Sequence, residues 1–211
     1  MSNILGQMQK DLYEGNVEAV RAATEKALAE GLSAQEILND GLIGGMDEVG
    51  RDFKAGDLFI PEVLIAARAM HAGLDVLRPI LAESGVKTVG KMVVGTVSGD
   101  LHDIGKNLVA MMMEGAGFEI IDLGTDVKPE EFVAAVRNEG AALLGMSALL
   151  TTTMPSMQTT IEALVEAGLR DKVKVMVGGA PVTASFAEKI GADAYAPDAA
   201  SAVDTARRLV G

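Results

Sequence analysis

Apolar residues recur at intervals of three and four along the first 84 residues, a spacing that predicts amphipathic helices. The run NVEAVRAATEKALAEG predicts one helix with Asn16 as its N-cap. Ser33 and Glu36 have the spacing of a capping box, and they open a further helix through SAQEILNDGLIGGMDEVGRDF. A turn then leads to Pro61, which suits a first helical turn. With a short helix around residues 4–13, the pattern predicts an antiparallel four-helix bundle.

From residue 87 onward, short apolar runs alternate with helical patterns. The apolar runs are KMVVGTV, FEIIDLG, ALLGMSAL, KVKVMVGG and AYAP. Helical patterns cover residues 103–116, 129–139, 156–168 and 183–190, and a last one ends at Val210. Strands that are apolar throughout are typical of a parallel sheet with helices on both faces. The chain is therefore predicted to be α/β, with a helical domain at 1–84 and a doubly wound five-stranded parallel sheet at 88–211.

Composition narrows the possible functions. A chain of 49% hydrophobic and 23% charged residues is typical of a soluble globular protein with a sizeable core. The absence of cysteine excludes disulfides, thiolate metal sites and cysteine nucleophiles, and it fits a reducing compartment, so we expect the cytoplasm. No signal segment opens the chain, and no apolar stretch reaches the ~20 residues of a bilayer span. A net charge of −12 would repel nucleic-acid phosphate and anionic lipid, so neither is an expected partner.

Ligands of doubly wound sheets bind outside the carboxyl ends of the strands. The loops to examine are therefore SGDLHDIGKN, GTDVKP, SALLTTTMPS and GGAPVT. The first holds His102, one of two histidines in the chain. Asp100 stands two positions earlier and can accept the second ring N–H, which would fix the tautomer that presents the other nitrogen. Gly105 follows without a side chain, so something bulky can approach the backbone there.

The sequence gives little support for a conventional metal, hydrolase, nucleotide-binding or phosphorelay site. A zinc site needs three or four ligands, and the other histidine, His71, lies in the helical half. H-E-x-x-H, P-loop, G-x-S-x-G and dinucleotide-binding G-x-G-x-x-G motifs are absent, and MSALLT stands where a phosphorelay receiver needs an aspartate. A surface histidine without a special role stays open as an alternative. A single histidine backed by a carboxylate suits a metal that brings its other ligands, such as a tetrapyrrole-held ion.

Four motifs together carry a resemblance to a known family. DLHDIG, SALLTTT and GGA resemble, in order and spacing, the D-x-H-x-x-G, S-x-L and G-G signature of cobalamin-binding domains. The segment at 52–70, DFKAGDLFIPEVLIAARAM, resembles the family's cap segment. The match is most like the corrinoid module of methionine synthase and the small corrinoid proteins of microbial methyltransferase systems. It implies a helical cap followed by a Rossmann-like (flavodoxin-like) domain with cobalamin as cofactor.

The resemblance also implies roles for individual residues. His102 would be the lower axial cobalt ligand in place of the cofactor's own base, the base-off/His-on mode. Asp100 would be the carboxylate behind it, and Thr153 stands where methionine synthase has a serine that ends a proton relay. Phe53 and Ile60 would cap the reactive face, although bundle core is an equally good interpretation. The cofactor's nucleotide tail would enter a groove lined by Ser147, Leu149, Thr151, Gly178 and Gly179, with Tyr195 to Ala199 at its far end. The other expected cofactor contacts are Gly99, Leu101, Asp103, Ile104 and Gly105.

The implied function is that of a methyl carrier. A substrate-specific methyltransferase would load it, a second one would pass the methyl group to tetrahydrofolate or a thiol, and a reductive activase would restore the cofactor. The chain alone should turn over little. The cap would have to swing away for each partner, with LAESGVK near residues 81–87 as the hinge. Open alternatives are a cobalamin-dependent sensor, an isomerase small subunit and a flavodoxin-like module for another ligand or a protein.

Overall fold

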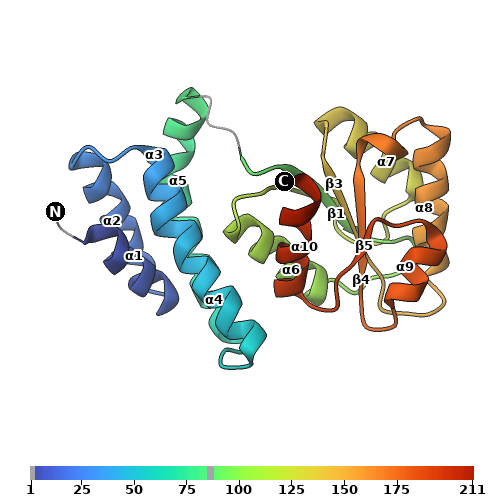
Figure 1. Ribbon diagram of the computed structural model, residues 1–211, viewed down its shortest axis with the longest axis horizontal. Coiled ribbons are helices and arrows are strands. Elements are labelled where there is room, and N and C mark those ends of the chain that lie inside the picture. The colour runs from blue at the N-terminus through green and yellow to red at the C-terminus, as the bar shows by residue number, and fades with distance from the viewer. Residues whose placement is uncertain (1–2, 85–87) are drawn as a thin grey trace. The chain divides into compact units, whose positions relative to one another are not determined.

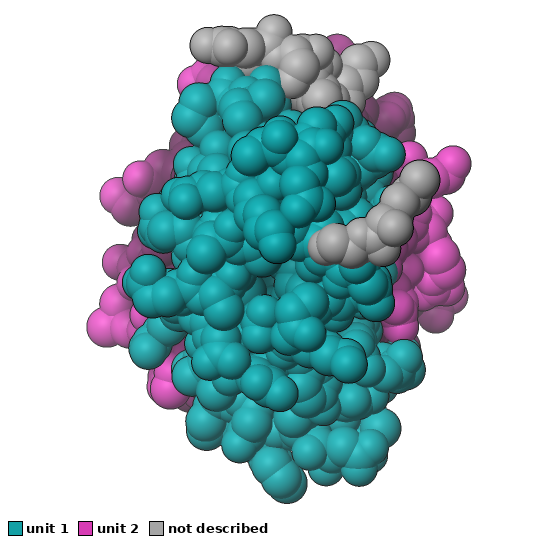
Figure 2. Space-filling view, turned by 90° about the vertical axis from the view of Figure 1, so that its left-hand side faces the viewer, with its two compact units in different colours: residues 1–88, 115–117 teal, residues 89–114, 118–211 magenta. Residues whose placement is uncertain are grey.

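The computed structural model describes residues 3–84 and 88–211 of the chain. They form two compact units, one with residues 1–88 and 115–117 and the other with residues 89–114 and 118–211 (Figure 2). We keep 1–84 and 88–211 as the proposed domain boundaries. Of the hinge predicted near residues 81–87, residues 81–84 belong to the last helix of the first unit and residues 85–87 lie outside the described residues, so the hinge stays a prediction.

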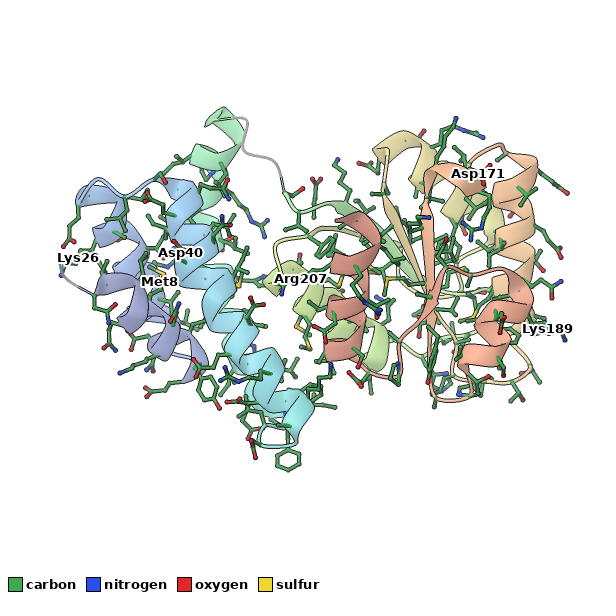
Figure 3. The ribbon with its side chains drawn as sticks, in the orientation of Figure 1. Met8, Lys26, Asp40, Asp171, Lys189 and Arg207 are labelled. Atoms are coloured by element: carbon green, nitrogen blue, oxygen red, sulfur yellow. The ribbon has the colours of Figure 1, made fainter. Side chains whose placement is uncertain are left out.

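The first unit is a helical bundle, as predicted. Met8 and Leu12 of its first helix are fully buried, and Met8 points toward the other helices while Lys26 points away from the bundle (Figure 3). Pro61 lies in the first turn of the last helix, where its missing N–H leaves no helical bond unmade. The elements are α1 (Ile4–Tyr13), α2 (Val17–Ala29), α3 (Ala34–Glu36), η1 (Ile37–Ile43), α4 (Gly44–Ala55) and α5 (Ile60–Ser84).

The local sequence patterns predicted some features of these helices and missed others. The capping box of Ser33 and Glu36 is present, with both reciprocal bonds formed. Asn16 occupies the N-cap of α2 as predicted, although its side chain donates to Glu14 and makes no capping hydrogen bond. The sequence also gave no sign that η1 is π-helical, because its apolar spacing is close to that of an α-helix.

The second unit holds five parallel strands in the order β2-β1-β3-β4-β5. Helices α6 and α10 cover one face of the sheet, and α7, α8 and α9 cover the other (Figure 1). The doubly wound fold is thus confirmed. The elements are β1 (Lys91–Thr96), α6 (Ile104–Gly115), β2 (Glu119–Asp122), α7 (Pro129–Glu139), β3 (Leu143–Ser147), α8 (Pro155–Glu166), η2 (Arg170–Lys172), β4 (Lys174–Gly178), α9 (Ala184–Ile190), β5 (Ala194–Tyr195) and α10 (Ala199–Val210).

Close packing on both faces explains why the strands are apolar throughout. Val93, Leu144 and Val175 are fully buried at the centre of the sheet. A Cβ atom at Gly95 would lie 2.7 Å from the ring of Phe132 on α7, so the strand needs a glycine where this ring packs. None of the helices in the described part of the chain is long and apolar enough to cross a membrane.

The winding of the sheet reverses between β1 and β3, which are neighbours although β2 lies between them in sequence. The chain goes from β1 outward to β2 and then returns to β3 on the other side. At their carboxyl ends Thr96 pairs with Ser147, and Ser147 pairs with Gly178. This row of strand ends borders the crevice where ligands bind in such sheets.

Candidate functional site

The segment between β1 and α6 holds a buried carboxylate beneath an accessible ring. Asp100 is fully buried, whereas the side chain of His102 is 51% exposed. The Asp100 backbone N–H donates to the Val97 carbonyl (3.1 Å), and the Thr96 hydroxyl donates to the His102 carbonyl (2.8 Å). The backbone on both sides of Asp100 is therefore fixed by the end of β1.

Asp100 determines which nitrogen of His102 is available. Its Oδ1 lies 2.7 Å from the ring Nδ1 and also accepts the His102 backbone N–H at 3.1 Å. Because an ionised carboxylate only accepts hydrogen bonds, Nδ1 of the neutral ring carries the hydrogen. The lone pair then lies on Nε2, and the side chain is oriented so that this nitrogen can bind a metal.

The other carboxylate oxygen is held by the loop after β3. Oδ2 of Asp100 accepts the N–H groups of Leu149 (2.8 Å) and Leu150 (3.3 Å) and the Thr153 hydroxyl (2.7 Å). Burial raises the pKa of Asp100, but the bonds from Thr153, Leu149 and His102 outweigh it and hold the pKa well below its usual range. The resulting stabilisation is present in full above an unfolded pKa of about 4. It is lost as the pH falls from there toward the folded pKa.

Thr153 completes a continuous chain of three side chains. It is buried, and its hydroxyl also lies 2.9 Å from the Leu150 carbonyl. A hydroxyl has a single hydrogen, so it donates to Asp100 or to Leu150 at any one moment. The hydrogen-bonded order is therefore the His102 ring, the Asp100 carboxylate and the Thr153 hydroxyl.

The surface around His102 is apolar and open. Leu101 is 73% exposed and Ile104 is 76% exposed, and Leu149 and Leu150 are also exposed. A Cβ atom at Gly105 would meet nothing within 4 Å. In the described ranges, no three His, Cys, Asp or Glu side chains are grouped so that they could hold a metal ion. A metal bound by His102 would have to bring its remaining ligands, and the exposed apolar side chains suit a large, flat macrocycle around it.

The residues predicted for the nucleotide-tail groove all lie at the carboxyl edge of the sheet. Gly179 has φ of +123°, and a Cβ there would lie 1.9 Å from the Ala148 carbonyl oxygen, so only glycine fits. The other groove residues occupy strand ends, the loop after β3 or the start of α10: Ser147, Leu149, Thr151, Gly178, Tyr195 and Ala199. Gly99 and Asp103, two further expected cofactor contacts, lie in the segment between β1 and α6.

Phe53 and Ile60 belong to the helical unit, on α4 and at the first residue of α5. Ile60 is 42% exposed, so it is not a core residue of the bundle. Phe53 is half-buried. Both roles over a cofactor stay predictions.

Lys106 is a residue near the site that the sequence reasoning missed. Its side chain is almost fully buried, and its Nζ atom lies 2.5 Å from Asp122 Oδ2 and 2.6 Å from Asn107 Oδ1. This pairing ties the first turn of α6 to the end of β2. The available sequence signal was a lysine next to the apolar run of a predicted helix. Because a buried ammonium group is costly unless it is paired, a lysine there needs an acidic partner.

Comparison with known proteins identifies the family. Models described as B12 binding domain match residues 90–204 and, separately, residues 4–78. The dimethylamine corrinoid protein of Methanosarcina barkeri is 49% identical over 98% of this chain and 97% of its own length. The chain belongs to the B12-binding corrinoid proteins. A corrinoid protein of Desulfitobacterium hafniense is 42% identical over 99% of this chain and 98% of its own length.

Solved structures agree with this assignment. A cobalamin-binding protein from Desulfitobacterium hafniense matches with a TM-score of 0.80 and 34% identity, over 98% of both chains. The methanol:cobalamin methyltransferase complex from Methanosarcina barkeri contains a chain that matches with a TM-score of 0.89 and 32% identity, over 99% of this chain and 80% of that one. The predicted cobalamin cofactor is therefore confirmed, and the donor set and open surface at His102 fit it.

Replacing Asp100 by asparagine should change the tautomer of His102 in this corrinoid protein without the cofactor. An amide has one oxygen, and Leu149 and Leu150 both present backbone N–H groups that cannot become acceptors. The His102 backbone N–H on the other side is also a fixed donor, but it is one against two. The amide oxygen will therefore face Leu149 and Leu150 and its NH2 group will face the His102 ring, so Nδ1 becomes the acceptor and Nε2 takes the hydrogen. Two-bond ¹H–¹⁵N spectra of ¹⁵N-histidine protein measure this directly.

The wild-type ring should show the lone pair on Nε2 in the same spectra. Thr153→Val is the matched control, because it removes a bond to the other carboxylate oxygen and leaves the Oδ1 partner in place. If Asp100→Asn keeps the wild-type tautomer, the assignment of Asp100 as the group that orients the ring is wrong.

Gly105→Leu should separate folding from cofactor binding. The space beside Gly105 is open and the residue lies in α6. The free energy of unfolding by urea, measured without cofactor, should therefore equal that of wild type or exceed it by up to about 1 kcal/mol. The added side chain should nevertheless weaken hydroxocobalamin binding at least about tenfold, or ~1.4 kcal/mol, because it fills space left for the macrocycle. Val165→Leu on the exposed side of α8 is the control for added bulk, and binding as tight as wild type by Gly105→Leu would contradict the placement.

Proposed function

We propose that this corrinoid protein is a methyl carrier that binds cobalamin base-off, with His102 Nε2 as the axial ligand of cobalt. The observation that carries the proposal is the 2.7 Å contact between Asp100 Oδ1 and His102 Nδ1, made by a fully buried carboxylate beneath an accessible ring. A ligand oriented in this way needs little further ordering when it meets a metal.

The bound cofactor supplies a cobalt centre that accepts and releases methyl groups. Asp100 holds the hydrogen at Nδ1 and raises the basicity of Nε2 by the strength of that bond. Thr153 donates a hydrogen bond to Oδ2 of Asp100. This bond weakens the hydrogen bond that Asp100 accepts from the ring of His102. The three groups together let the chain favour ligation or release of His102 as the cofactor changes state.

Apolar residues around His102 would exclude water from the lower face of the macrocycle. Leu101, Ile104 and Leu149 are exposed without the cofactor and would be covered by it. The cofactor's nucleotide tail would enter the groove along Ser147, Thr151, Gly178 and Gly179, with Tyr195 and Ala199 at its end. Phe53 and Ile60 would shield the upper face.

The proposed partners are methyltransferases. Relatives 42–49% identical to this chain include dimethylamine and trimethylamine corrinoid proteins, so methylamines are the first donors to test. A similar solved chain comes from a methanol:cobalamin methyltransferase complex, which supports a carrier that docks to its methyltransferase. An acceptor methyltransferase acting on tetrahydrofolate or a thiol, and a reductive activase, would complete the system.

Loss of the His102 ring should remove axial nitrogen from the metal. Protein with ¹⁵N-labelled histidine, loaded with cob(II)alamin, should show the twofold splitting of ¹⁵N in its electron paramagnetic resonance spectrum, whereas the cofactor's own base would give the threefold splitting of ¹⁴N. His102→Ala should lose the ¹⁵N splitting while the chain stays folded. His71→Gln, at the other histidine, should keep it. A His102→Ala spectrum identical to that of wild type would refute ligation by His102.

The carrier role is tested by a single methyl transfer. The loaded and reduced protein should be methylated by dimethylamine or trimethylamine only when a methyltransferase for that amine is present, as monitored by absorbance. Without the methyltransferase the spectrum should stay unchanged, since a carrier depends on its partner enzyme to activate the methyl donor. Equal rates with and without the methyltransferase, or no transfer with any methylamine or methanol enzyme, would count against a methyl carrier.

A further inference from the structure

The loop after β2, residues 123–128, holds a residue in an unusual backbone conformation. Asp126 has φ of +55° and is the non-glycine residue with positive φ in the described part of the chain. A Cβ atom makes this left-handed conformation unfavourable, although aspartate and asparagine tolerate it best. Such conformations persist where surrounding contacts hold them, and they cluster at functional sites.

The conformation lets Asp126 make two hydrogen bonds to the segment that carries His102. Its backbone N–H donates to the Asp100 carbonyl at 3.0 Å. Its Oδ1 accepts the Gly99 backbone N–H at 2.7 Å and lies 3.4 Å from the Ser98 hydroxyl. The contacted residues all lie within four positions of His102, and Gly99 itself is left-handed with φ of +83°.

We propose that Asp126 is a positioning residue for the axial ligand. It fixes the turn at Gly99 and Asp100 from a second loop, while the loop after β3 holds the Asp100 carboxylate. This inference rests on the proposed function, because it concerns how well His102 meets cobalt. Without the hydrogen bonds of Asp126, the turn at Gly99 and Asp100 is held from one side only and must be ordered when the cofactor binds. The entropy cost of that ordering lowers the fraction of protein in which His102 is coordinated.

Few side chains meet both requirements at position 126. Glycine adopts a positive φ but offers no acceptor to the Gly99 N–H. Alanine offers no acceptor and is strained there. Asparagine keeps both the conformation and a carbonyl oxygen at the same place but removes the charge. The substitutions therefore separate backbone conformation, acceptor geometry and charge.

The experiment compares variants of the full chain loaded with cob(II)alamin. The histidine is ¹⁵N-labelled, and the readout is the ratio of the spectral component with ¹⁵N splitting from His102 to the component without it. Asp126→Asn should keep the wild-type ratio. Asp126→Gly should lower it about tenfold, the scale expected for one hydrogen bond to a charged group. Asp126→Ala should lower it at least as far, and Asp126→Gly carries the test if the strained alanine variant does not fold.

Asp193 supplies a matched control for general loss of stability. Its Oδ2 accepts the Val175 backbone N–H at 2.8 Å, so it too is a carboxylate that joins two backbone segments. It precedes β5, at the amino ends of the strands, whereas the His102 segment is at their carboxyl ends. Asp193→Gly should lower the urea midpoint and leave the splitting ratio unchanged.

The outcomes distinguish this inference from the function on which it rests. If the wild type shows no ¹⁵N splitting from labelled histidine, the proposed ligation fails first. If the wild type shows it and Asp126→Gly has the same ratio, the positioning role is overturned while ligation by His102 stands. A loss in Asp126→Asn as large as in Asp126→Gly also overturns it, because the amide keeps the acceptor and the backbone conformation.

Discussion

The site depends on one buried charge. Asp100 is fully enclosed, and an ionised carboxylate in such a place is tolerated only when its oxygens are hydrogen-bonded. Five donors from two segments meet that need: two from His102, and one each from Leu149, Leu150 and Thr153. Because these donors surround both oxygens, the carboxylate fixes the loop after β1, the loop after β3 and the histidine ring together.

The doubly wound topology is what brings those segments to one point. β1 and β3 are adjacent in the sheet although 47 positions separate Thr96 from Leu143, and their following loops leave at the same edge. The loop after β2 reaches the same segment through Val127, whose N–H donates to the Thr96 carbonyl at 3.0 Å. A rigid sheet with apolar strands thus supports an irregular segment that could not hold its own geometry.

Much of this was readable in the sequence. Apolar runs of five or so residues between helical patterns predicted every strand, and the spacing of Asp100 and His102 predicted their contact. Thr153 could be placed only through family resemblance, since no local pattern brings it to a residue 53 positions earlier. The Leu149 and Leu150 N–H donors were invisible because every residue has one. Asp126 and Asp122 lay in or beside a loop already marked as part of the ligand edge, but their importance lies in a backbone angle and a buried lysine partner.

The π-helical segment η1 has a consequence for the rest of its helix. Each turn of a π-helix takes up about one residue more than an α-turn, so the segment works like a one-residue insertion within an otherwise α-helical run. One residue corresponds to about 100° of rotation around an α-helix axis. The side chains of α4, Phe53 included, are therefore rotated about the helix axis by that angle relative to a continuous α-helix. The direction of the Phe53 ring thus depends on a segment two to three turns earlier in the chain.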